Sequence, residues 1–222
     1  WDPKKARRAL LKGFAFGLLT LGMIAVMHYA SGLRVIDKPK PPAEYLTRML
    51  RVTLQAITVG ILEEVAMRGI LFRTLARVWK PWIAAVVLSA LFAGLHFVIP
   101  SATIYDPDKS WFTLSWQALA SIPEGFYEEP FVAIQFINLA LMGLVMTAVV
   151  IRTRTIWWAA GIHGGWVWIK LMSGFTTNED YAFGTHHPFL GWRNDATDGW
   201  LATLLLLVML ANIVWWPKKT ST

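Results

Sequence analysis

The distribution of apolar residues along the chain predicts a series of membrane-spanning helices. A helix needs about 20 mostly apolar residues to cross roughly 30 Å of hydrocarbon. Six stretches reach or approach this length, and charged residues are sparse in most of them. The sequence therefore predicts an all-α fold, a polytopic membrane helical bundle with about six transmembrane helices, over residues 10–33, 48–75, 81–99, 131–151, 155–172 and 199–216.

The connection at 101–130 has a different pattern. Trp111 and Trp116 recur among polar residues, and Pro123 interrupts the segment. Such a segment is typical of a short helix that lies in the membrane interface. No repeat, low-complexity tract or linker divides the chain, so residues 1–222 are predicted to form a single integral membrane domain.

Composition supports a membrane chain and excludes other classes. Of the 222 residues, 55% are hydrophobic and 16% charged, whereas a soluble domain is roughly half apolar and about a quarter charged. The absence of cysteine excludes disulfides, thiolate metal sites and a cysteine nucleophile. The net charge of +7 does not require nucleic acid as a partner, because basic residues gather in the cytoplasmic loops of membrane proteins.

The positions of the basic residues predict the orientation. The loops predicted to lie outside, 101–130 and 173–198, contain only Lys109 and Arg193 as basic residues. Because basic loops stay in the cytoplasm, both termini are predicted to be cytoplasmic, in a membrane that we expect to be the bacterial inner membrane. The stretch 34–51 opposes this orientation, since it is predicted to lie outside and contains Arg34, Lys38, Lys40, Arg48 and Arg51.

Ionisable side chains inside the predicted spans are the candidate functional residues, because such groups are costly in hydrocarbon. They are Glu63, Glu64 and Arg68 in the second span, His96 in the third and His163 in the fifth. On a helix, Glu64 and Arg68 are i,i+4 neighbours and can form an ion pair, which leaves Glu63 without a local counter-charge. Small residues beside His163 allow close helix packing or access by a ligand, namely Gly161, Gly164 and Gly165.

Helix geometry predicts that two of these groups meet. Glu64 lies 16 residues before Lys80, at the turn between the second and third spans, and His96 lies 16 residues after it. At 1.5 Å per residue, both lie about 24 Å from the turn in two antiparallel helices. We therefore expect Glu63 and His96 to meet across the helix pair.

Two kinds of water activation fit these residues. A carboxylate and an imidazole can share a water, the carboxylate acting as general base while a second imidazole stabilises the oxyanion. Alternatively, Glu63, His96 and His163 can hold a divalent metal, zinc, since two imidazoles and one carboxylate with an open position form a catalytic zinc set. The H-E-x-x-H signature is absent, so the sequence leaves zinc and no cofactor both open.

Three motifs contain the candidate residues. E-E-x-x-x-R occupies 63–68, F-x-x-x-H occupies 92–96, and a short apolar helix contains His163. Over about 55–170 the chain resembles the CPBP family, the CAAX-processing and bacteriocin-processing intramembrane proteases. Eukaryotic relatives act on prenylated CaaX tails, and bacterial relatives are associated with bacteriocin processing or self-immunity.

The resemblance also implies a role for each candidate residue. In an intramembrane endopeptidase of this kind, Glu63 and His96 would activate water. Glu64 and Arg68 would support and orient the site, and His163 would help to form the oxyanion hole. The implied partners are membrane lipid and a peptide or membrane-protein substrate.

One position departs from the family pattern. The family's third motif runs H-x-x-x-N or H-x-x-x-D, whereas Val167 stands four residues after His163 and cannot donate a hydrogen bond. Loss of one oxyanion donor costs on the order of 10²–10³ in rate, unless Asn138 on the preceding span supplies the amide. The departure favours an alternative, an inactive member that acts as a membrane scaffold or regulatory subunit in a membrane-protein complex. A proton relay through the same buried groups is a third class.

Three further histidines have simpler interpretations. His28 is predicted to lie at the membrane interface beside Tyr29, with pigment or haem ligation as the sharper alternative. His186 and His187 lie in an acidic loop and are predicted to be solvated rather than metal ligands.

Overall fold

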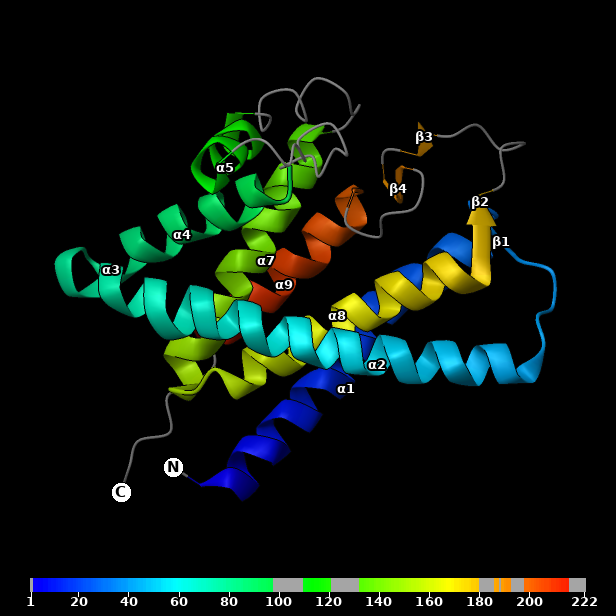
Figure 1. The fold of residues 1–222 in the computed structure, drawn as a ribbon, viewed down its shortest axis with the longest axis horizontal. Helices are drawn as coiled ribbons and strands as arrows, with labels where there is room; N and C mark the ends of the chain where they lie inside the picture. Colours follow the sequence, from blue (N-terminus) through cyan, green and yellow to red (C-terminus); the bar gives the residue numbers. More distant parts are fainter. Residues whose placement is uncertain are drawn as a thin grey trace.

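The computed structural model describes residues 2–97, 110–120, 132–179, 186–187, 189–192 and 198–215. Each of the six stretches predicted as spans contains a helix, and so does the segment predicted to be interfacial (Figure 1). The all-α prediction is confirmed, because the strands within these residues form only two short antiparallel pairs. The helices are α1 (Pro3–Ala30), α2 (Pro42–Glu64), η1 (Val65–Phe72), α3 (Arg73–Val78), α4 (Pro81–Leu95), α5 (Trp111–Ala120), α7 (Val132–Thr153), α8 (Trp157–Thr176) and α9 (Trp200–Trp215). The strands are β1 (Arg34–Ile36), β2 (Thr177–Glu179), β3 (His186–His187) and β4 (Gly191–Trp192).

Two of the described helices, α1 and α7, are long and apolar enough to cross a membrane. The helices α4 and α9 are apolar but have 15 and 16 residues. At 1.5 Å per residue they extend about 22 to 24 Å, less than the thickness of the hydrocarbon. Helix length and apolarity therefore do not confirm the predicted count of six spans.

The first helix begins nearer the amino terminus than the predicted span does. The carboxylate of Asp2 accepts hydrogen bonds from the backbone N–H groups of Lys4 (3.0 Å) and Lys5 (3.3 Å), which is the usual role of an N-cap aspartate. Pro3 follows at the first position, where its fixed φ suits a helix. The basic residues near the amino terminus therefore lie on the first turns of α1 rather than in a loop before it.

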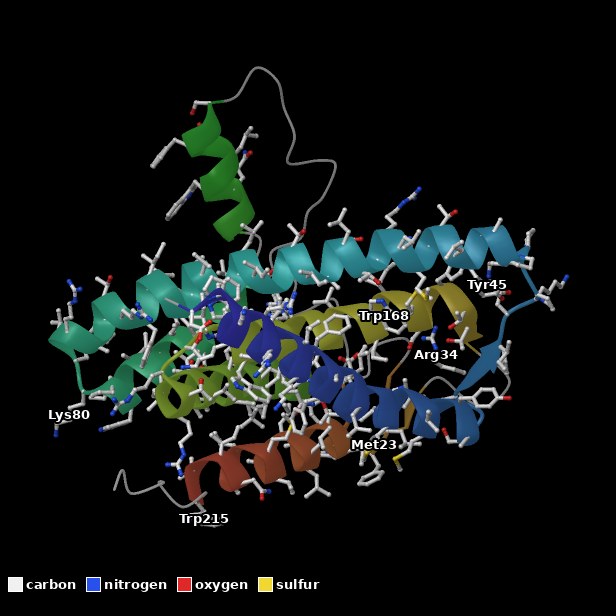
Figure 2. All side chains as sticks on the ribbon, turned by 90° about the horizontal axis from the view of Figure 1, so that it is seen from below. Met23, Arg34, Tyr45, Lys80, Trp168 and Trp215 are labelled. Atoms are coloured by element: carbon white, nitrogen blue, oxygen red, sulfur yellow. The ribbon has the colours of Figure 1, made fainter. Side chains whose placement is uncertain are left out.

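A continuous helical rod runs across the width of the molecule from Pro42 to Val78 (Figure 1). It consists of α2, the π-helical segment η1 and α3. Such π-helical segments are rare and frequently occur at functional sites. The rod ends at Trp79, whose backbone is extended, and α4 begins at Pro81 and runs back along it. Lys80 marks this turn at one end of the molecule in Figure 2.

Helix α8 packs closely against both α1 and α2 (Figure 1). On the α1 side, a Cβ added at Gly161 would overlap the carbonyl oxygen of Leu10. On the α2 side, a Cβ added at Gly60 would lie 2.6 Å from the carbonyl oxygen of Ala160. Backbone approach through small residues is the usual way for helices to associate in membranes. These contacts fix the depth and rotation of the helix that carries His163.

Helix α7 organises the other half of the bundle. It contacts α4 on one side and α9 on another, and it also reaches α8 and η1. Residues from α1, α7, α8 and α9 form one buried apolar cluster around it, which includes Ile24, Val145, Met146, Trp166 and Leu206.

A strand pair and a buried arginine close the end of the bundle at which α1 and α8 finish. Arg34, which Figure 2 labels beside this end, donates from Nη2 to the carbonyls of Thr177 (2.7 Å) and Ser173 (3.3 Å). Carbonyls at a helix C-terminus attract cations. Lys40 similarly donates to the carbonyl of Phe175 at 3.1 Å. Two of the basic residues that oppose the predicted orientation are thus held in structural contacts.

The three histidines outside the candidate set lie in a buried hydrogen bond and in a short strand. His28 is buried within the protein, and its Nε2 donates to the carbonyl of Leu190 at 2.5 Å. The bond ties the end of α1 to the segment before α9. His186 and His187 form β3, whose backbone pairs with β4.

Helix α5 stands away from the other helices (Figure 2). Phe112 and Trp116 on it are 81% and 66% exposed, so these two large side chains do not pack into the bundle. The expected helix is present, and its position in the membrane interface stays a prediction.

Candidate functional site

A buried ion pair lies at the junction of α2 and η1. Arg68 Nη1 donates to Glu64 Oε1 at 2.8 Å, and both side chains are fully buried. The guanidinium also reaches α7, where Nη2 donates to the carbonyl of Gly143 (3.0 Å) and Nε to Thr147 Oγ1 (3.4 Å). A buried charge pair is more stable when its remaining hydrogen-bonding groups find partners, as those of Arg68 do, although Oε2 of Glu64 has none among the described residues. The i,i+4 pair expected from the sequence is therefore present, with acceptors on α7 that satisfy the arginine.

His163 lies between the two glutamates. Its Nδ1 is 3.2 Å from Glu64 Oε1, and its Nε2 is 3.7 Å from Glu63 Oε2. A carboxylate oxygen can only accept, so Nδ1 donates to Glu64. The two carboxylates differ in environment, since Glu64 is fully buried whereas the side chain of Glu63 is 42% exposed. The structure thus brings together four of the five predicted residues, from α2, η1 and α8.

His96 is placed differently from the expectation. It is the C-cap of α4, its Nδ1 donates to the carbonyl of Phe92 at 2.9 Å, and its side chain is exposed. No hydrogen bond or ion pair joins Glu63 to His96 in the described part of the structure. The imidazole that Glu63 meets among the described residues is that of His163. Equal depth on two helices does not fix the rotation of their side chains, and the local bond holds the His96 ring against its own helix.

Phe92 connects His96 to the rest of the site. Its ring centroid lies 4.6 Å from that of His96 and 6.0 Å from that of His163. The guanidinium carbon of Arg68 lies 5.1 Å from the same ring, which is within the range of a cation–π contact. Phe92 was part of a sequence motif but received no role there. In the structure its ring contacts the imidazoles of His96 and His163 and packs against the guanidinium of Arg68.

Two residues on α7 were not predicted from the sequence. Thr147 is fully buried, accepts from Arg68 and donates to the carbonyl of Gly143 at 2.9 Å. Gly143 permits close approach, because an added Cβ would lie 2.9 Å from Ser89 on α4. The available signal was the small-x-x-x-small spacing of Gly143 and Thr147 in an otherwise apolar helix, which is typical of close helix contacts.

The predicted zinc ligands do not form a metal site. Three ligands must converge on one point at about 2 Å from the ion. Among the described residues, no group of three His, Asp or Glu side chains is arranged to hold a metal. The set Glu63, His96 and His163 therefore does not fit a metal in this geometry.

Asn138 is also unsuited to the role considered for it. Its Nδ2 donates to the carbonyl of Gly199 at 3.1 Å, and its Oδ1 accepts from Thr203 at 2.6 Å. These bonds join α7 to the beginning of α9. The amide that Val167 cannot supply is therefore not replaced by Asn138.

Comparison with known proteins agrees with this cluster of residues. A family model described as type II CAAX prenyl endopeptidase Rce1-like matches residues 45–169, more than half of the chain. The matched range contains all five candidate residues. No curated protein and no solved structure matches the chain. The chain therefore belongs to the Rce1-like family of type II CAAX prenyl endopeptidases, a membrane-embedded family within the CPBP group that its motifs resemble.

Proposed function

We propose that the protein is an intramembrane endopeptidase in which Glu63 activates water. The observation that carries the proposal is the difference between the two adjacent glutamates. Glu64 is buried and neutralised by Arg68, whereas Glu63 is 42% exposed and lies 3.7 Å from the imidazole of His163. A general base needs access to water and a free carboxylate, which Glu63 has and Glu64 lacks.

Glu63, His163 and His96 each have one role in the proposed reaction. Glu63 takes a proton from water as the oxygen attacks the peptide carbonyl, and the same carboxyl then delivers that proton to the leaving amine. Because Nδ1 of His163 donates to Glu64, Nε2 is the nitrogen that faces the reacting groups. In its protonated form, Nε2–H can donate to the tetrahedral oxyanion. His96, exposed at the end of α4, would orient the water from the other side of Phe92.

Glu64, Arg68 and Thr147 are positioning residues in this mechanism. The hydrogen bonds of Arg68 to α7 hold Glu64, and Glu64 holds the ring of His163 in one orientation. Fixed hydrogen-bond donors stabilise a developing charge without reorganisation during the reaction. No step uses a metal, because the candidate ligands do not converge.

We also propose that six helices span a bacterial inner membrane with both termini in the cytoplasm. The 15- and 16-residue helices α4 and α9 would cross where the bilayer is locally thinned, which costs fractions of a kcal/mol per Å of mismatch. The partners of the protein are then lipid and a peptide or membrane-protein substrate. Prenylated CaaX tails are the first substrates to test, since the matching family model is named for them.

The test compares two glutamates on the same helix. Purified protein in detergent is incubated with a farnesylated CaaX peptide carrying a fluorophore and quencher, and with the same peptide lacking the lipid. We expect Glu63→Gln to lower kcat/KM by about 10²–10⁴-fold, the usual contribution of a general base. The control Glu44→Gln lies in the first, exposed turn of α2 and should retain the wild-type rate. Equal rates for both variants would refute the role of Glu63.

A second candidate function is supported by Val167. A member without the usual amide donor can keep the buried ion pair for stability and act as a scaffold for another membrane protein. In that case Glu63→Gln has no effect on a biological readout, and the protein co-purifies with a stoichiometric partner. Cleavage of either peptide by a monodisperse wild-type preparation contradicts the scaffold function.

A further inference from the structure

A cavity of about 550 Å³ lies at one end of the bundle, away from the candidate active site. It is bordered by the beginning of α1, the junction of η1 with α3, and the turn between α7 and α8. The amino end of α1 and the α7–α8 turn lie on the same side of the molecule (Figure 1). Since α1 and α7 are the two helices that qualify as membrane spans, the cavity lies where two such helices end.

Three of the eleven residues that line the cavity are cationic. Lys5, Arg73 and Arg154 come from three different elements, and Asp2 is the one acidic residue among the lining side chains. Asp2 is already engaged as the N-cap of α1 and lies 3.8 Å from Lys5. The two arginines have no carboxylate partner among the described residues. Convergent cations of this kind match a compact polyvalent anion, and arginine binds phosphate oxygens in bidentate fashion.

The backbone of the α7–α8 turn supports a role for Arg154. Its φ of 56° is the single positive φ of a non-glycine residue among the described residues. A left-handed conformation is unfavourable for arginine, and such outliers gather at functional sites. The turn would form more easily with glycine or asparagine, so the arginine is best explained by its side chain, which lines the cavity.

The remaining lining groups suit a phosphate at a membrane surface. Ile156 and Trp157, the N-cap and first residue of α8, border the cavity, so the positive end of that helix dipole adds to the cationic side chains. Tryptophan is enriched at the level of lipid headgroups. Basic pockets between membrane helices bind anionic headgroups.

We propose that this cavity binds the phosphate of an anionic phospholipid headgroup. The site is separate from the cluster around Glu64, although Gly69, which borders the cavity, adjoins Arg68 in the chain. The ligand chemistry is a phosphate group, either esterified or inorganic. It can come from a lipid or from free phosphate, and the two sources are distinguished by experiment.

The test measures binding to the whole purified chain in a neutral detergent. The probes are dioctanoyl phosphatidylglycerol, dioctanoyl phosphatidylcholine and inorganic phosphate, each titrated by calorimetry at low salt. We expect phosphatidylglycerol to bind at least about tenfold more tightly than phosphatidylcholine. Each basic residue near an anionic headgroup contributes about 1 kcal/mol, so the double variant Arg73→Gln/Arg154→Asn should weaken this binding roughly 30-fold.

The choice of variants separates binding from folding. Asparagine tolerates the positive φ at position 154, so Arg154→Asn removes the charge without straining the turn. Arg77→Gln is the matched control, because Arg77 is exposed on α3 and does not border the cavity. It should leave the affinity within about twofold of the wild type.

Two results would overturn the proposal. One is equal affinity for the two lipids, and the other is an affinity for phosphatidylglycerol that the double variant leaves unchanged. If inorganic phosphate binds as tightly as phosphatidylglycerol and loses the same factor in the double variant, the phosphate site is supported and its assignment to a lipid is overturned. None of these outcomes depends on peptide cleavage.

Discussion

The two sides of α8 contact their neighbours by different physical means. Towards α1, Gly161 and Gly165 bring the backbones together, and a neutral hydrogen bond joins Trp166 Nε1 to Thr20 Oγ1 at 2.9 Å. Towards α2, Gly164 and Gly60 allow the same close approach, but His163 also meets Glu64 and Glu63. The α1–α8 contact therefore depends on close backbone packing, whereas the α2–α8 contact depends on close backbone packing and on ionisable side chains.

This difference separates two requirements of the candidate active site. The α1 contact fixes the depth of His163 but contributes nothing to its protonation or orientation. The Glu64–Arg68 pair orients the ring, and it depends on α7 for the hydrogen bonds that satisfy the arginine. Substitutions in the α1–α8 contact should change the free energy of unfolding. Substitutions in the Glu64–Arg68 pair should change both the free energy of unfolding and the rate of peptide cleavage.

The largest effect on stability is expected from breaking the buried ion pair. Arg68→Met leaves Glu64 as an unpaired charge in a fully buried position, which typically costs about 3–5 kcal/mol. The free energy of unfolding can be measured by titration with sodium dodecyl sulfate in mixed micelles. In the double variant Glu64→Met/Arg68→Met both charges are absent, and most of the loss should be recovered. A cost below about 1 kcal/mol for Arg68→Met would show that Glu64 finds another partner or is neutral.

The next largest effect on stability is expected at the α1–α8 contact. In Gly161→Ala the new methyl group meets the backbone of α1, which cannot move aside as a flexible side chain would, and overpacking of this kind costs about 2–3 kcal/mol. Gly174→Ala on the same helix has open space around the new Cβ and should be neutral or slightly stabilising. The same unfolding titration measures both. Similar changes in stability for the two variants would show that the α1 contact does not determine the outcome.

A smaller effect is expected at the hydrogen bonds between Arg68 and α7. Thr147→Val keeps the shape of the side chain but removes the hydroxyl that accepts from Arg68. The free energy of unfolding should fall by about 1 kcal/mol, and the rate of peptide cleavage should fall as well. Ser89→Ala is the matched control, because the buried Ser89 hydroxyl has no hydrogen-bond partner among the described residues. Its stability should stay within about 0.5 kcal/mol of the wild type. A larger loss in Ser89→Ala than in Thr147→Val contradicts this assignment of the arginine's partners.

No effect is expected from removal of divalent metals. Because the candidate ligands do not converge, treatment with 1,10-phenanthroline should leave the rate of peptide cleavage unchanged. A non-chelating isomer, 1,7-phenanthroline, controls for effects of the compound on the detergent micelle. A rate that falls with the chelator and returns on addition of zinc would show that the histidines rearrange around a metal.

Local rules predicted the helices and one contact of the site correctly. Long apolar runs indicated the six helical segments, and the i,i+4 spacing indicated the pair of Glu64 and Arg68, because both rules depend on neighbours in sequence. The glycines around His163 indicated close packing, and the structure has it on both sides of α8.

Contacts between distant segments were harder to predict. Residue counting placed Glu63 and His96 at similar depth, but their rotation depends on the π-helical segment after Glu64 and on the end of α4 at Leu95. Neither feature has a clear sequence signal. Thr147 was missed because a lone threonine in an apolar helix usually bonds to its own backbone, as it also does here.

The glycine contact between α1 and α8 has a consequence for biogenesis. Gly13 and Gly161 are brought together although 148 positions separate them in the chain. At a synthesis rate of about 5–20 residues per second, the first helix waits on the order of ten seconds for its partner to leave the ribosome. During that interval the glycine face of α1 is open to the translocon or to other nascent segments. The imidazole of His163 thus reaches its place only after most of the chain has been synthesised.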